Sequence, residues 1–230
     1  MDTKYIYELV NSKKFKYIKE KYIKSEDFHI DIYITNSKDV SCYMRKIGNH
    51  QYAFFINPTY VTEDIAEYCV FHEFFHCVQY EDNFPMIGRQ REDKVCRTMQ
   101  TFLASAVLDL NVNYLLYKEN IILENSLLKG YEDIKNFYRL IDSHKKQIPE
   151  TVMLQQSLSL SFFYMEDTQN IIEDYLKELN INHSDTVNAV RKMTEIIKAY
   201  DYNTQKGCEN IFVNIMEEFH LERWIYVRSN

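Results

Sequence analysis

Glycine and proline are scarce in this sequence of 230 residues, which contains four glycines and three prolines. Because these residues punctuate loops and linkers, their scarcity argues against long flexible connections and favours one compact domain. The five cysteines form an odd set without regular spacing. This pattern excludes a disulfide framework, and no Cys-x-x-Cys pair is present to bind a metal.

Long apolar runs are also missing. No stretch approaches the length of a membrane span, and the N-terminus, Met1 to Lys4, has no apolar signal core. We therefore expect a cytoplasmic protein without a membrane partner. Acidic residues outnumber basic ones, giving a formal net charge of −7. This balance argues against nucleic acid as the main partner.

The segment His72-Glu73-Phe74-Phe75-His76 spells the motif HExxH. Two histidines four positions apart lie on the same face of a helix, so both imidazoles can reach one metal ion. The glutamate beside the first histidine can then act on a water bound to that metal. The motif therefore indicates a metal-dependent hydrolase if the segment is helical.

The surrounding residues favour a buried helix. Residues 65–78 contain no glycine or proline and are mostly apolar, and Thr62-Glu63-Asp64 supplies a capping hydroxyl and acids for a first turn. Apolar residues occupy every face, so we expect burial nearly all round. Unpaired polar groups there cost about 1–3 kcal/mol each, and a metal would satisfy both histidines and the glutamate. The alternative is a pair of core histidines bonded to backbone carbonyls.

A catalytic zinc needs a third protein ligand and keeps a fourth position for water. Asp82 lies six residues after His76, but Gln79 stands where enzymes with HExxHxxGxxD have the glycine that turns the chain. Glu119 lies in a polar run typical of a solvated helix end. Asp109 is the third candidate, and it is the one that we predict.

Asp109 lies on the apolar stripe of a second expected helix, residues 95–116. A buried carboxylate needs a counter-ion, and zinc would supply one. The alternatives are an ion pair with Arg97 or Lys94, or an outward orientation. Asn113, one turn further on, either orients a ligand or forms a helix-to-helix hydrogen bond. We therefore predict zinc held by His72, His76 and Asp109.

HExxH on one helix, with a third ligand on the next, resembles the zincin metallopeptidases of the gluzincin type. Residues 109–113 are similar to the Asp-x-x-x-Asn stretch of small bacterial metallopeptidase-like proteins of that clan, in which aspartate replaces the usual glutamate. The resemblance covers about residues 28–119. It implies zinc-dependent hydrolysis of a peptide bond in an intracellular protein substrate, with Glu73 as general base. It also implies that strand 52–57 lies beside the zinc and pairs with substrate through a free edge.

We expect an α+β fold in which residues 1–119 form a zincin-like catalytic core with a small antiparallel or mixed sheet. The first 25 residues should form a basic helix that covers the sheet, rather than one that binds nucleic acid or membrane. A mostly helical part, residues 120–230, should pack on this core in one continuous domain. Strands are expected at 28–34, 40–46 and 51–56, helices at 131–140, 151–165, 168–179, 184–199 and 209–220, and breaks at Gly130, Pro149, 180–183 and Gly207.

Two other functions fit the same residues. A binding or structural protein on a zincin-like scaffold would use zinc for stability without turnover. A hydrolase acting on a non-peptide amide would use the same metal chemistry. Peptide hydrolysis also calls for a group that stabilises the oxyanion. The spacing selects none of its candidates, which are Tyr114, Tyr117, His183 and His220.

Overall fold

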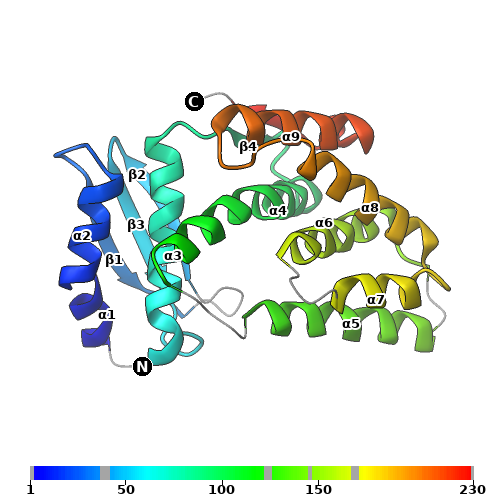
Figure 1. Cartoon of the computed structure of the whole chain (residues 1–230), viewed down its shortest axis with the longest axis horizontal. Coiled ribbons are helices and arrows are strands. Elements are labelled where there is room, and N and C mark those ends of the chain that lie inside the picture. Colours follow the sequence, from blue (N-terminus) through cyan, green and yellow to red (C-terminus); the bar gives the residue numbers. More distant parts are fainter. Residues whose placement is uncertain (1–2, 37–41, 122–125, 145–146, 167–170, 229–230) are drawn as a thin grey trace. The chain divides into compact units, whose positions relative to one another are not determined.

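The computed structural model describes residues 3–36, 42–121, 126–144, 147–166 and 171–228 (Figure 1). The fold is mixed α+β, as expected. Two compact units are present: unit 1 contains residues 1–83 and 112–123, and unit 2 contains residues 84–111 and 124–230. The long helix α4 (Lys94–Lys118) contributes residues to both. The expected division between residues 119 and 120 stays a prediction.

Unit 1 is built on a three-stranded mixed sheet. Its strands β1 (His29–Ile34), β2 (Cys42–Gly48) and β3 (Gln51–Ile56) lie in the order β1-β3-β2, with β1 parallel and β2 antiparallel to β3. The expectation that β3 has a free edge is therefore wrong. Strand β3 is central: β2 pairs with one of its edges in a hairpin, and β1 pairs with the other edge in parallel. The free edges belong to β1 and β2.

The expected N-terminal helix is broken into α1 (Thr3–Val10) and α2 (Lys13–Tyr22). Ser12 causes the break, because its hydroxyl accepts a hydrogen bond from the backbone N–H of Phe15 at 3.1 Å and caps α2. Phe15 and Ile18 are buried, while most lysines of α2 are exposed. The helix thus covers the core with its apolar face, as we expected.

The HExxH segment lies in α3 (Glu63–Glu81). This helix is buried on most sides, as the sequence predicts, and packs against the alternate sheet residues Tyr52, Phe54 and Ile56. Phe74 of α3 and Phe15 of α2 meet with ring centroids 5.2 Å apart. The last turns of α4 join the same core through Val112 and Leu116. The sheet, α2, α3 and the end of α4 therefore share one apolar core.

Unit 2 is mostly helical and contains α5 to α9 and a short two-stranded sheet. The 3₁₀ turn η1 separates α9 from the last strand, and β4 pairs antiparallel with β5. Buried residues of α4, α6, α8 and α9 form its main core. The bounds are β4 (Met86–Arg89), α5 (Ser126–His144), α6 (Glu150–Glu166), α7 (Ile171–Leu179), α8 (Ser184–Lys198), α9 (Gln205–Glu218), η1 (Leu221–Arg223) and β5 (Ile225–Arg228).

Two of the expected breaks in unit 2 are wrong. Gly130 lies inside α5, and Gly207 lies in the first turn of α9. Gly207 is needed for close packing rather than for a break, because a β-carbon there would lie 1.8 Å from the carbonyl oxygen of Asp201. Strands β4 and β5 were not expected. The starts of two expected elements, residues 40–41 and 168–170, lie outside the described residues.

Candidate metal centre

His72, His76 and Asp109 come together as a group that could hold a metal ion. Each offers one ligand atom, and these atoms all lie within 4.8 Å of one another. The histidines come from α3 and the aspartate from α4, and all three side chains are partly buried. The three residues are the ones that the sequence singles out. The geometry does not identify the metal.

The two imidazoles are aimed at a common point. Their Nε2 atoms lie 3.2 Å apart, and the ring planes are 82° from each other. Two nitrogens bound to one tetrahedral zinc at about 2.0–2.1 Å each would be roughly 3.3 Å apart. The observed spacing therefore matches the spacing that shared coordination requires.

Gln79 holds the ring of His76 from the side away from this point. Its Oε1 lies 2.9 Å from Nδ1 of His76, and its side chain is buried. A proton on Nδ1 donated to this carbonyl oxygen leaves a lone pair on Nε2 for a metal. In the sequence, Gln79 stands out only as a departure from a glycine motif. Its position three residues after His76 on a helix is the signal that predicts this contact.

Tyr68 and Asn113 connect α3 to the end of α4 within unit 1. The hydroxyl of Tyr68 donates to Oδ1 of Asn113 at 3.4 Å, so Asn113 forms the helix-to-helix hydrogen bond that was one of its two expected roles. Tyr68 lies one turn before His72, and Asn113 lies one turn after Asp109. The contact thus links α3 to the last turns of α4 within unit 1. The ring of Tyr68 also lies 5.7 Å from that of His72.

Glu73 is buried and lies near three cysteines. Burial raises the pKa of the Cys69 thiol to about 11, and the charge of Glu73 adds to the effect. The same two causes raise the pKa of Cys42, the first residue of β2, and of Cys77. Burial and the charge of Glu73 thus both oppose the thiolate form of these three cysteines.

The other two acids considered as ligands are not part of the group. Glu119 accepts hydrogen bonds from Nζ of Lys21 at 2.7 Å and from the hydroxyl of Tyr22 at 2.6 Å. Asp82 is exposed just beyond the end of α3. At 100° per residue, six positions after His76 carry it to a different side of the helix axis. Neither joins the candidate metal-binding group found among the described residues.

The expected oxyanion stabiliser is not identified by the structure. Tyr114 and Tyr117 are 46% and 72% exposed. His183 contacts Asp142 with Nε2 and Oδ1 2.8 Å apart, which gives it a structural partner in unit 2. Tyr68 is the tyrosine found against a histidine of the group.

A cavity of about 310 Å³ in unit 2 borders Asp109. It lies between α4 and α6, and its apolar walls include Phe102, Phe162 and Phe163. The small side chains of Ser105 and Ala106 on α4 leave this space open. Any group bound at the carboxylate of Asp109 thus has an aromatic cavity beside it.

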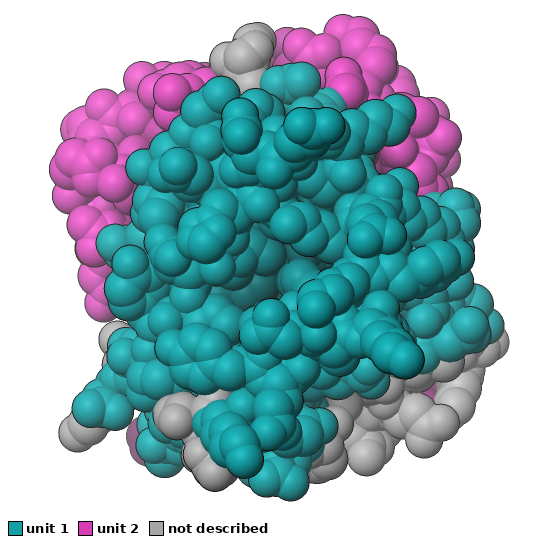
Figure 2. Space-filling view, turned by 90° about the vertical axis from the view of Figure 1, so that its left-hand side faces the viewer, with its two compact units in different colours: residues 1–83, 112–123 teal, residues 84–111, 124–230 magenta. Residues whose placement is uncertain are grey.

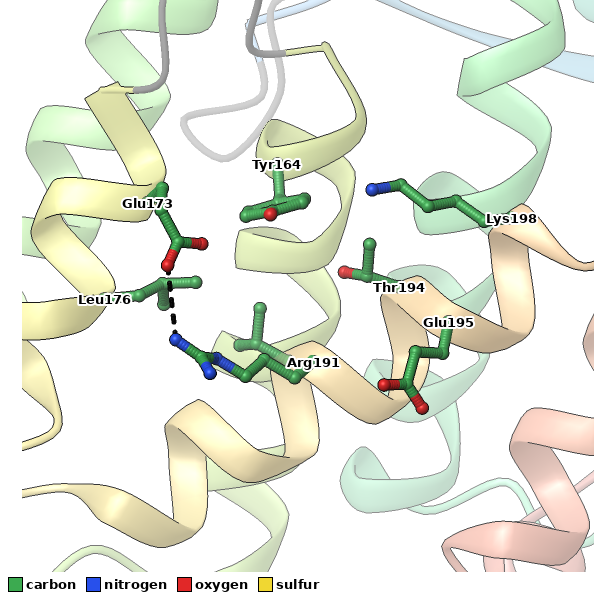
Figure 3. A pocket seen from close by; sticks show the side chains of 8 residues that line it. Tyr164, Glu173, Leu176, Arg191, Thr194, Glu195 and Lys198 are labelled. Carbon is green, nitrogen blue, oxygen red and sulfur yellow. Dashed lines mark hydrogen bonds and ion pairs between the residues drawn. The ribbon is translucent and has the colours of Figure 1, made fainter.

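A second cavity of unit 2, of about 340 Å³, has a different character (Figure 3). Arg191 and Glu173 form an ion pair there at 3.2 Å, and Nζ of Lys198 lies 4.9 Å from the ring centroid of Tyr164. Glu195 balances the remaining positive charge. No candidate metal ligand lines this cavity in the described part of the chain, so we assign it no part in the metal chemistry.

Comparison with known proteins identifies no relative from which a function could be inferred for this chain. No protein-family model, no curated protein and no solved structure matches this chain. Among the described residues, no helix is both long enough and apolar enough to cross a membrane. A function for this protein therefore has to be inferred from the geometry of the site alone.

Proposed function

We propose that this protein is a zinc-dependent metallopeptidase of zincin-like design, with His72, His76 and Asp109 as the zinc ligands and Glu73 as general base. The observation that carries the proposal is the convergence of the three ligand atoms within 4.8 Å of one another. HExxH supplies both histidines and the adjacent carboxylate from one helix. The proposed substrate is a peptide segment of an intracellular protein.

The donor set favours zinc. Two imidazoles and one carboxylate are the ligands of several catalytic zinc sites, and three protein ligands leave a position open for water. The hydrogen bond between His76 and Gln79 supports this set, because metal-bound imidazoles usually donate their other ring N–H to an oxygen. A harder ion such as Mg²⁺ would favour oxygen ligands instead.

The proposed chemistry divides between the metal and the carboxylate. Bound zinc lowers the pKa of water toward neutrality and polarises the scissile carbonyl. Glu73 accepts a proton from the attacking water and delivers it to the leaving nitrogen. Gln79 keeps the ring of His76 in the tautomer that a ligand needs. The aromatic cavity beside Asp109 gives a substrate side chain a place to bind.

Paired substitutions test this proposal. Purified protein should contain about one zinc per chain, and His72→Ala should remove it because two ligands hold zinc poorly. Glu73→Gln should retain the zinc and lose peptide cleavage, because it removes the base and leaves the ligands in place. Asp109→Asn should weaken zinc binding, whereas Asp82→Asn and Glu119→Gln should not. Metal content is measured by atomic emission, and cleavage by mass spectrometry on a peptide library.

Two outcomes would overturn the proposal in different ways. Unchanged metal content after replacement of both histidines would remove the metal site. Zinc bound by the three residues, with a melting temperature lowered by chelation but no peptide cleaved, would indicate a structural zinc. In that case Glu73→Gln would have no functional effect. Cleavage of small amides in place of peptides would indicate the same chemistry on another substrate.

A further inference from the structure

Strand β1 is an edge strand with a groove along its free side. It pairs with β3, and no second partner is found for it among the described strands. A groove of about 500 Å³ lies between β1 on one side and α1 and α2 on the other. Figure 2 views the molecule from this side and shows the surface of unit 1 hollowed.

Backbone groups of β1 point into this groove. The N–H of His29 donates to the carbonyl of His50, just before β3, and the N–H of Thr35 donates to the carbonyl of Ile56 in β3, both at 2.9 Å. Alternate residues of a strand direct their backbone groups to opposite sides, so Ile30 and Ile32 direct theirs away from β3. The hydroxyl of Tyr7 in α1 donates to the carbonyl of Ile32 at 3.4 Å, which agrees with this direction. The carbonyl of Ile32 thus already accepts from Tyr7, while the N–H groups of Ile30 and Ile32 and the carbonyl of Ile30 face the groove and can pair with a further strand.

The shape of the groove fits one extended chain. Phe15 and Phe28 line it and are buried, so its base is apolar. Tyr7 and Val10 of α1 form part of the wall that faces β1. A strand from a second sheet would have to reach β1 from the side of this wall. The helices on this wall therefore favour a single extended segment over the edge strand of another copy. With six residues in β1, the edge is about 20 Å long at roughly 3.3 Å per residue.

The charge at the groove favours an acidic partner. Lys16 and Lys19 line its helical side. Their neighbours Lys14 and Lys21 are paired with Glu67 and Glu119, whereas no acidic partner of Lys16 is recorded in the part of the chain that the structure describes. Asp31 is the acid among the described lining residues, and it lies 2.9 Å from His29. An incoming carboxylate would therefore meet Lys16, which has no acidic partner among the described residues.

We infer that this groove binds an extended segment of a partner protein, which adds as a strand to β1 and places an acidic side chain near Lys16. Main-chain hydrogen bonds to Ile30 and Ile32 give the affinity, and the apolar base and the lysines give the selectivity. His72, His76 and Asp109 are not among the described residues that line the groove. The inference therefore does not depend on the proposed peptidase function, and binding persists after the metal is removed.

Two labelled peptides test the inference on the full chain. The probes are fluorescein-labelled Val-Glu-Val-Glu-Val-Glu and its counterpart with lysine in place of glutamate, measured by fluorescence anisotropy in EDTA. The glutamate peptide binds saturably, and the lysine peptide binds at least about 10-fold more weakly. Lys16→Glu reverses this preference. Lys13→Glu, an equal charge change on α2 outside the groove, leaves it unchanged.

N-methylated versions of the glutamate peptide test strand addition itself. An added strand directs every other amide toward its partner, so methylation of one alternate set abolishes binding and methylation of the other set does not. Equal effects of the two sets would overturn strand addition. Absence of saturable binding by both probes would overturn the inference as a whole. Self-association, seen by sedimentation, that the glutamate peptide reverses would assign the groove to a second copy and would also overturn it.

Discussion

At the residue scale, the candidate centre depends on groups that hold the histidines in place. The ring of His76 is held by Gln79, and the ring of His72 lies against that of Tyr68. Both partners are on α3, three or four residues from the histidine that they contact, so one helix positions each ligand together with its support. Local helical geometry thus sets the direction of both imidazoles before any metal binds.

Gln79→Ala should lower zinc affinity about 10–100-fold, because the hydrogen bond that selects the tautomer of His76 is lost. The dissociation constant is measured by competition with a chelating dye at fixed pH. Gln51→Ala, an exposed glutamine on β3, is the matched control and should bind zinc like the unchanged protein. Equal affinities for both variants would show that Gln79 does not support the site.

At the element scale, polar contacts hold α2 against the end of α4. Glu119 lies at this junction and accepts hydrogen bonds from Lys21 and Tyr22. Burial acts to raise the pKa of Glu119, but the hydrogen bonds from Lys21 and Tyr22 outweigh it and hold the pKa below its ordinary value of 4.5. The ring of Tyr22 also meets Phe75 of α3 with centroids 5.3 Å apart. The junction thus connects three helices of unit 1.

Glu119→Gln should lower the free energy of unfolding at neutral pH, and the loss should disappear in acid. A carboxyl group whose pKa is lowered by folding stabilises the protein above its unfolded pKa, and this stabilisation is lost as the pH falls through its folded pKa. Urea denaturation at pH 7 and at pH values below 4.5 gives the comparison. A difference between the two proteins that is constant with pH would contradict this account of Glu119.

The cavity between α4 and α6 should determine which peptides are cleaved. Ser105 lines this cavity and is exposed, so Ser105→Phe would place a large ring in the cavity. Cleavage of peptides with a large apolar side chain should fall about 10-fold, and cleavage of peptides with a small side chain should fall less. Zinc content should not change. Val95→Phe, on an exposed face of α4 away from the cavity, is the control. Equal losses for large and small side chains would remove the cavity from the substrate site.

Local patterns explain which elements could be predicted from the sequence. The bounds of β3 and the long helices α3 and α4 follow from apolar spacing and capping signals within each segment. The order of the strands depends on contacts between distant segments, so the pairing of β1 with β3 was not visible, and β3 was wrongly expected to have a free edge. Gly207 was wrongly predicted to break the helix. A glycine is needed there because the carbonyl of Asp201 packs against it, and Asp201 lies outside the helical segment whose pattern was used.

At the scale of the whole molecule, α4 is the element that matters most for the candidate centre. Its first part belongs to unit 2 and its last turns to unit 1, and Asp109 lies three residues before the change. The motif alone predicted two ligands on one helix, but the third depends on where a second long helix lies. The apolar stripe of residues 95–116 was enough to select Asp109 over Asp82 and Glu119. The supporting roles of Gln79 and Tyr68 were not predicted, because the HExxH spacing identifies metal ligands and not the residues that hold them.

The most direct test of the central claim is an anomalous-scattering map at the zinc absorption edge, from crystals of the unchanged protein grown with zinc. Our account predicts one strong peak, with the nitrogens of His72 and His76 at about 2.0–2.1 Å and an oxygen of Asp109 at about 2.0–2.2 Å. The fourth position should face solvent and be open to water. A map without a peak between these residues, or a peak whose protein ligands exclude the two histidines, would contradict the proposed metal centre.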